Sequence, residues 1–197
     1  MREGVRLLLE REGYRVLAEA SDGREACRLA EELHPDVALL DVSMPVLNGI
    51  DAARTLRERC PAVRTIALTV HDDHGHVLDA LRAGFSGYVL KSQAAKELVT
   101  AIEQVHAGQV YLGPAPSRLL LEAYREGRPS PTDPLTPRER EVLQLLAEGH
   151  ATREIASVLG TSIKTVESHR VHIQRKLGLQ EPAALTRYAI RQGIIEP

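Results

Sequence analysis

The sequence predicts an α/β domain built on a parallel sheet, followed by a smaller all-α domain. Residues 14 to about 106 alternate short apolar, β-branched runs with segments of helical period, which is the rhythm of β-α-β units. Residues 135–197 contain helical patterns throughout, and a segment rich in proline and glycine separates the two regions. We therefore expect two domains joined by a linker.

Short apolar runs mark the strands of the first domain. The predicted strands cover residues 14–18, 36–40, 64–69 and 87–90. The predicted helices cover residues 2–10, 24–33, 50–59, 77–83 and 94–106. Two of the strands are continuously apolar, which is typical of parallel strands covered by helices on both faces.

The linker is predicted at residues 108–134. It contains Gly-Pro-Ala-Pro, a short helical stretch near residues 119–124, and four prolines or glycines within its last eight residues. We therefore place the first domain at residues 1–107 and the second at residues 135–197.

Composition indicates a globular, cytoplasmic protein. The length of 197 residues and the hydrophobic content of 43% are ordinary for two modest domains. No apolar run approaches the roughly 18 residues of a membrane-spanning helix, and the first residues carry acids where a signal peptide would be apolar. We expect no membrane partner.

Cys27 and Cys60 lack metal-ligand spacing and should be buried, reduced packing residues.

Charge is only weakly asymmetric along the chain. Residues 135–197 contain nine Lys/Arg and seven Asp/Glu, whereas the rest contains sixteen and twenty. This difference is compatible with a second domain that binds nucleic acid, but it does not establish one.

Three chemically different side chains stand at the ends of predicted strands. Asp41, Thr69 and Lys91 supply a carboxylate, a hydroxyl and an ammonium group. In open parallel sheets the carboxyl ends of the strands meet at one edge, so these groups can converge. A carboxylate can accept a phosphoryl group while a lysine and a hydroxyl hold the transferred oxygens. Taken singly, each residue also fits a turn, a strand end or a solvated charge; their joint spacing favours a phosphoryl-acceptor site.

The segments around these residues resemble the receiver domains of two-component response regulators. The similar segments are Leu-Asp-Val-Ser-Met-Pro-Val-Leu-Asn-Gly at 40–49, Ala-Leu-Thr at 67–69 and Gly-Tyr-Val-Leu-Lys at 87–91. The resemblance implies a flavodoxin-like (CheY-like) fold with strand order 2-1-3-4-5 and a sensor histidine kinase as partner.

The resemblance also implies a role for individual residues. Asp41 corresponds to the phosphoacceptor, Thr69 to the switch hydroxyl, Tyr88 to the switch aromatic and Lys91 to the invariant lysine. Phosphorylation would draw the hydroxyl towards the phosphoryl group and the aromatic ring inward. An aromatic residue at a strand end is also often a packing residue, so both interpretations of Tyr88 stay open.

The sequence departs from receivers at its N-terminal end. It begins at the helix of residues 2–10, where the resemblance implies a preceding central strand that ends in an acidic pair for Mg²⁺. Neither Asp22 nor residues 72–73 replace that pair, so Asp41 offers only part of a Mg²⁺ site and we expect a poor phosphoacceptor. Strands flanking the missing one would have unpaired edges.

Three explanations of this departure are open. The first, which we favour because the other receiver residues are intact, is that the start is misassigned and the protein is longer. The domain is otherwise a degenerate receiver that works without phosphorylation, or another chain supplies the strand.

The second domain shows a helix-turn-helix pattern. Thr136-Pro-Arg-Glu139 is a capping box that opens a helix to about residue 148. Residues 152–159 form a short helix, residues 160–161 a turn, and Ser162 caps a helix over residues 163–177. A last helix covers residues 182–192.

Residues 135–195 resemble the LuxR-type helix-turn-helix, which identifies the chain as similar to response regulators of the NarL/FixJ family. The matching positions are Glu139, Leu143, Gly149, Glu154, Ile155, Ala156, Leu159, Thr165, Val166, His169, Ile173, Lys176 and Leu177.

The helix of residues 163–177 has two different faces. Val166, Ile173 and Leu177 form the stripe expected to face the core, with His169 at its edge as a packing residue. The predicted DNA-binding residues surround it: Lys164, Thr165, Glu167, Ser168, Arg170, Val171, His172 and Arg175.

The resemblance divides these residues by role. It places Glu167, Ser168 and Val171 towards bases, whereas Lys164, Thr165, Arg170 and Arg175 suit phosphates. Many relatives carry lysine where Glu167 stands. A glutamate can accept from cytosine N4 but also repels phosphate.

Together these observations predict a DNA-binding transcriptional response regulator that binds double-stranded promoter DNA as a homodimer. Leu185, Tyr188 and Ala189 of the last helix either complete the core or pair two subunits, and the resemblance favours pairing. The alternatives are a phosphorylation-independent regulator, a helical interaction module without DNA affinity, and a flavodoxin-like enzyme. No Gly-rich phosphate loop supports the enzyme, so we expect none.

Overall fold

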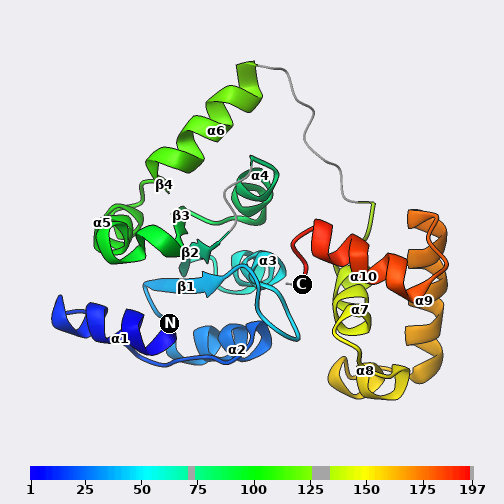
Figure 1. Ribbon diagram of the computed structural model, residues 1–197. Helices are drawn as coiled ribbons and strands as arrows, with labels where there is room; N and C mark the ends of the chain where they lie inside the picture. The colour runs from blue at the N-terminus through cyan, green and yellow to red at the C-terminus, as the bar shows by residue number, and fades with distance from the viewer. Residues whose placement is uncertain (71–73, 126–133, 196–197) are drawn as a thin grey trace. The chain divides into compact units, whose positions relative to one another are not determined.

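The computed structural model describes residues 1–70, 74–125 and 134–195 (Figure 1). The chain divides into two compact units. The first unit comprises Met1–Val42 and Gly49–Pro131, and the second comprises Ser43–Asn48 and Thr132–Pro197. Within the described ranges, no helix is both long enough and apolar enough to span a bilayer.

A parallel sheet with the order β1-β2-β3-β4 forms the centre of the first unit. Its strands are β1 (Val37–Asp41), β2 (Arg64–Thr69), β3 (Gly87–Leu90) and β4 (Tyr111–Leu112). β2 and β3 have the predicted bounds, and β1 lies one residue later than predicted. Because Asp41 is opposite Leu68 and Thr69 is opposite Leu90, β1, β2 and β3 end at the same edge.

Helices cover both faces of this sheet (Figure 1), as the apolar strands predicted. The helices are α1 (Arg2–Arg11), α2 (Gly23–Leu33), α3 (Gly49–Arg59), α4 (His74–Ala83), α5 (Ala94–His106) and α6 (Pro114–Arg125). α1 and α5 share one face, where Ile66, Leu98 and Val105 are fully buried. α2, α3 and α4 share the other face. Cys27 and Cys60 are free and buried, as predicted.

The strand predicted at residues 14–18 is not formed. In the order 2-1-3-4-5 this segment would pair with a central strand, and the described residues contain no strand between it and β1. Without a neighbour, its backbone groups have no ladder hydrogen bonds to make. Tyr14 and Val16 instead pack, partly buried, against the core beneath α5. β1 therefore lies at the edge of the sheet.

Two elements lie within the segment predicted as a linker. β4 extends the sheet by pairing with β3, with Tyr88 opposite Leu112. α6 begins at Pro114 and is longer than the helical stretch predicted near residues 119–124. Proline lacks an N–H group, which the first helical turn does not need, so Pro114 and Pro116 open this helix. The prediction placed a short helix within a linker, and the helix observed there is longer than expected.

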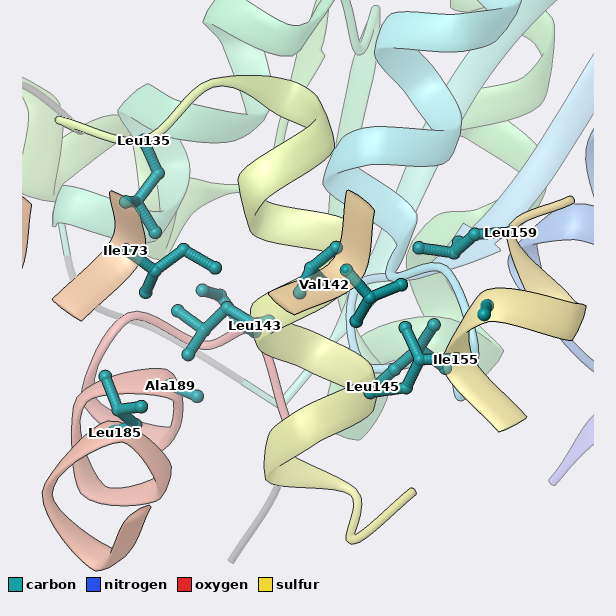
Figure 2. Packing of buried hydrophobic residues seen from close by; sticks show 12 residues of the cluster. Leu135, Val142, Leu143, Leu145, Ile155, Leu159, Ile173, Leu185 and Ala189 are labelled. Carbon is teal, nitrogen blue, oxygen red and sulfur yellow. The ribbon is translucent and has the colours of Figure 1, made fainter. Parts of the chain in front are cut away.

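The second unit contains four described helices: α7 (Pro137–Ala147), α8 (Thr152–Val158), α9 (Ile163–Leu177) and α10 (Pro182–Arg191). Figure 2 shows its core, in which Leu143, Leu145, Ile155 and Ile173 are fully buried. Between α8 and α9 lies the short turn of a helix-turn-helix. The bounds predicted for α9 and its cap at Ser162, which accepts from Thr165 N at 3.1 Å, are confirmed.

The buried stripe of α9 is as predicted, and α10 shows one of the two roles left open for it. Val166 and Ile173 are fully buried, and Leu177 packs beside them. On α10, Leu185 is 4% exposed and Ala189 is fully buried (Figure 2), so this side of the helix completes the core of its own chain. Of the two roles left open for this face, the burial of Leu185 and Ala189 supports core packing, because apolar side chains already covered have little surface left to bury.

An ion pair connects the beginning of α7 to the end of α9. Lys176 Nζ lies 2.6 Å from Glu139 Oε2, and Glu139 is 3% exposed. Glu139 also completes the predicted capping box, because its carboxylate accepts from Thr136 N at 2.8 Å. Burial alone raises the pKa of Glu139, but the hydrogen bonds from Lys176 and Thr136 hold this pKa below its usual range.

Replacing Lys176 with methionine should destabilise the second unit. The change leaves the buried carboxylate of Glu139 without its charged donor, at a cost of about 2 kcal/mol at neutral pH. A carboxyl group whose pKa is lowered in the folded state stabilises the fold at pH values above its unfolded-state pKa. The loss of stability in Lys176→Met relative to the wild type should therefore shrink as pH falls below about 4. Hydrogen exchange of the α7 and α9 amides in the full chain measures this deficit.

Lys164→Met is the matched control, because Lys164 is exposed on the same helix. It should leave the exchange of these amides unchanged. Equal protection in Lys176→Met and the wild type at neutral pH would contradict the prediction.

Candidate functional site

Asp41 and Lys91 meet at the carboxyl edge of the sheet. Asp41 is the last residue of β1, and Lys91 directly follows β3 as the first residue of the short 3₁₀ helix η1 (Lys91–Gln93). Lys91 Nζ lies 2.6 Å from Asp41 Oδ2. The Asp41 side chain is 34% exposed, so its carboxylate remains accessible from solvent while the lysine holds one oxygen. This arrangement suits a nucleophilic carboxylate with a cation beside it.

Thr69 ends β2, the strand between those that carry Asp41 and Lys91. It is 1% exposed, and its ladder partner Leu90 directly precedes Lys91. The structure therefore brings Asp41 and Lys91 into direct contact and places Thr69 at the adjacent strand end. This is the grouping that the spacing of the three residues predicted.

Gly49 holds the chain that returns from Asp41 to α3. Its N–H donates to Val42 O at 2.9 Å, and a Cβ atom at this position would lie 2.1 Å from the carbonyl oxygen of Asp41. Only a residue without a side chain allows the helix to begin so close to the strand end. The sequence analysis included Gly49 in the receiver-like segment without giving it a role. Its position eight residues after Asp41 was the available signal.

Tyr88 is fully buried in β3. β3 lies between β2 and β4, and Tyr88 is paired with Ala67 on one side and Leu112 on the other. The ring thus packs within the first unit, and its burial also fits the inward position that the resemblance implies for a switch aromatic. Both interpretations of Tyr88 remain compatible with its burial.

The described residues do not assemble a metal site. No group of three or more His, Cys, Asp and Glu side chains among them could hold an ion. Asp41 provides one carboxylate, with an oxygen already beside Lys91. Asp22 caps α2 instead, because its Oδ1 accepts from Arg24 N and Glu25 N, each at 2.9 Å. Residues 72–73 lie outside the described residues. The residues present therefore do not fit Mg²⁺ by themselves.

The predicted DNA-binding residues lie on the surface of α9. The exposed ones are Lys164, Thr165, Glu167, Ser168, Val171, His172 and Arg175, and Arg170 is half-buried. His169, expected to pack at the edge of the inner stripe, is also half-buried. All eight residues lie on α9 outside its buried stripe of Val166 and Ile173. Their side chains therefore share one face of the helix, which is polar except at Val171.

The hydroxyl of Thr165 already has a local partner. It lies 2.8 Å from the Oγ atom of Ser162, at the cap of α9. Lys164, Arg170 and Arg175 form no ion pair with any residue in the described part of the chain. Their charges are thus available to an anionic ligand, whereas Lys176 on the same helix is engaged by Glu139.

Two family models match this chain. The response regulator receiver domain matches residues 1–103, and the domain of the bacterial regulatory proteins of the luxR family matches residues 133–189.

Several known proteins are similar to this chain over nearly its whole length. The transcriptional regulatory protein MctR of Rhizobium johnstonii is 35% identical over 98% of this chain and 89% of its own length. The transcriptional regulatory protein DegU of Brevibacillus brevis is 35% identical over 99% of this chain and 90% of its own. The structure of RcsB from Salmonella enterica bound to promoter rprA is 30% identical, covers 95% of this chain and 91% of that chain, and has a TM-score of 0.60.

The receiver model covers the unit that contains Asp41, Thr69 and Lys91, and the luxR model covers the unit that contains α9. The matches to whole relatives show both parts in the same order in one chain. The chain therefore belongs to the NarL/FixJ-type response regulators, DNA-binding transcription regulators that combine a receiver domain with a luxR-type helix-turn-helix.

Proposed function

We propose that phosphorylation of Asp41 by a sensor histidine kinase controls promoter binding through α9. The observation that carries this proposal is the 2.6 Å contact between Lys91 Nζ and Asp41 Oδ2 at the edge of the sheet. A carboxylate oxygen of Asp41 would form the bond to phosphorus as the phosphorus–nitrogen bond of the donor histidine breaks. Lys91 would balance the charge of the phosphoryl oxygens, and Thr69 would donate a hydrogen bond to one of them.

Receiver domains of this family generally use Mg²⁺ for phosphorylation. The described residues contribute the Asp41 carboxylate without an acidic pair beside it. For that reason residue roles in the proposed step are assigned to Asp41, Thr69 and Lys91 only, and the test of the step supplies Mg²⁺ in solution. The protein itself is proposed to be a regulator without enzymatic turnover that acts in the cytoplasm, where promoters are found.

On the DNA side, we propose that α9 enters the major groove of double-stranded promoter DNA and that two copies bind as a homodimer. Lys164 and Arg175, which form no ion pair with the described residues, suit contacts with phosphates. One solved relative is described as RcsB dimers bound to DNA. Since Leu185 and Ala189 are buried in their own chain, pairing would use other residues of the protein.

A regulator that works without phosphorylation is the second candidate. It is favoured by the metal-ligand set, which is incomplete among the described residues, and by the position of β1 at the edge of the sheet. In this case the first unit would serve only for contacts with proteins, and Asp41 would form a structural ion pair with Lys91.

Treatment with radiolabelled acetyl phosphate and Mg²⁺ distinguishes the two candidates. The wild type should become labelled, and Asp41→Asn should not, because an amide is a poor nucleophile towards phosphorus. Asp36→Asn is the control, since Asp36 precedes the opposite end of β1 with a side chain that is 85% exposed. Equal labelling of the wild type and Asp41→Asn would refute the assignment of Asp41, and an unlabelled wild type would favour the second candidate.

Gel shifts with duplexes of different sequence test the role of α9. Lys164→Ala should weaken binding to all duplexes and lower the slope of log affinity against log salt by about 1, because one phosphate contact is lost. Ser168→Ala should instead change the preferred sequence. Arg28→Ala removes a comparable exposed charge in the first unit and should leave the slope unchanged. Unaltered binding by both α9 variants would remove this helix from the interface.

A further inference from the structure

Glu167 is the only acidic residue of α9, and it lies on the surface assigned to DNA. It is exposed, and its carboxylate has no hydrogen-bond or ion-pair partner in the described ranges. A carboxylate near the phosphate backbone is repelled, so Glu167 weakens any binding that depends on charge alone. Glu167 can therefore contribute favourably to DNA binding only where a base offers a hydrogen-bond donor to its carboxylate.

The major groove offers few such donors. Guanine presents two acceptors there, and thymine presents an acceptor and a methyl group. Adenine has a donor at N6, but the acceptor N7 beside it repels a carboxylate. Cytosine presents the N4 amino group as a donor without an adjoining acceptor of its own. An exposed glutamate on this helix thus matches cytosine better than the other three bases.

Val171 is an exposed apolar side chain on the same surface of α9 as Glu167. It follows Glu167 by four residues, so the two side chains lie on one face about one helical turn apart. Val171 is 60% exposed, whereas the other valine of α9, Val166, is fully buried. In the major groove an apolar side chain finds its favourable contact at the C5-methyl group of thymine.

The geometry of the helix limits the distance between the two bases. One helical turn rises about 5.4 Å, and successive base pairs are about 3.4 Å apart along a strand. Residues one turn apart on a helix in the groove therefore contact base pairs no more than about two steps apart.

We propose that Glu167 selects a cytosine and that Val171 selects a thymine within two base pairs of it, in each half-site. This inference rests on the proposed DNA binding by α9 and adds the bases that the helix recognises. Lys164, Arg170 and Arg175 would then supply affinity for any duplex, while Glu167 and Val171 discriminate among sequences.

Selection of bound duplexes from a randomised library, using the full chain, tests the role of Glu167. The wild type should enrich a cytosine at one fixed position of each half-site, with a thymine within two base pairs. Glu167→Ala should lose the preference for cytosine, on the order of tenfold, while its affinity for unselected duplexes rises. Glu167→Gln should shift the preference towards adenine, because glutamine can pair with both N6 and N7. Glu181→Gln, an exposed acid before α10, is the control and should select the wild-type sequence.

A single methyl group tests the role of Val171. Replacing the selected thymine by deoxyuridine removes only the C5-methyl group and should weaken wild-type binding about fourfold. Val171→Ser should bind the thymine and deoxyuridine duplexes equally, because it has no apolar contact to lose.

The outcomes separate this inference from the proposed function. A wild type that binds no duplex at low salt, either with or without prior treatment with acetyl phosphate and Mg²⁺, would contradict DNA binding by α9 itself, and with it the assignment of bases. A wild type that selects a site lacking the cytosine, or a Glu167→Ala variant that selects the same site equally well, would overturn the role of Glu167 while leaving DNA binding intact. Equal wild-type affinity for thymine and deoxyuridine would overturn the role of Val171.

Discussion

The contact between Asp41 and Lys91 depends on parallel strands that end in register. Asp41 ends β1 and Lys91 follows β3. Because β2 separates these two strands in the sheet, the side chains meet only if all three carboxyl ends share an edge. The close approach of Gly49 to the carbonyl of Asp41 adds a local constraint, because it fixes how the chain leaves that edge. The candidate site of the first unit thus depends on the topology of the sheet, because its residues come from different segments of the chain.

The elements that the sequence predicts well are those whose signal is local. The bounds of α5 and α9 are set by apolar periodicity and by neighbouring caps and turns, and both match the prediction. The segment at residues 14–18 carries an equally good strand pattern but remains irregular, because a strand also needs a neighbour. β4 has only two residues, which are too few to show a pattern in the sequence. The first turn of α6 contains prolines, which are more typical of a loop, so the beginning of this helix was not predicted.

The same distinction holds for the candidate sites. The spacing of Asp41 and Lys91 indicated their meeting, since strand ends are visible in the sequence. The role of Glu139 could be predicted only in part: its capping box is local, whereas its ion pair with Lys176 spans 37 residues and requires the packing of α7 against α9. This pair holds the end of α9, so the exposed face of the helix is defined by contacts at both its cap and its C-terminal turn.

The charge of the second domain bears on the proposal that two copies bind DNA as a pair. Residues 135–197 carry nine basic and seven acidic side chains, so one copy has little net attraction for a polyanion. Glu167, one of these seven acids, lies on α9 itself, and Lys176 of the same helix is engaged by Glu139 within the fold. When two copies are joined, the second binds at a high effective concentration, and affinity rises without any new contact. A signal that controls pairing would therefore have its largest effect on promoter occupancy when a single domain binds weakly. The small net charge of this domain creates that condition.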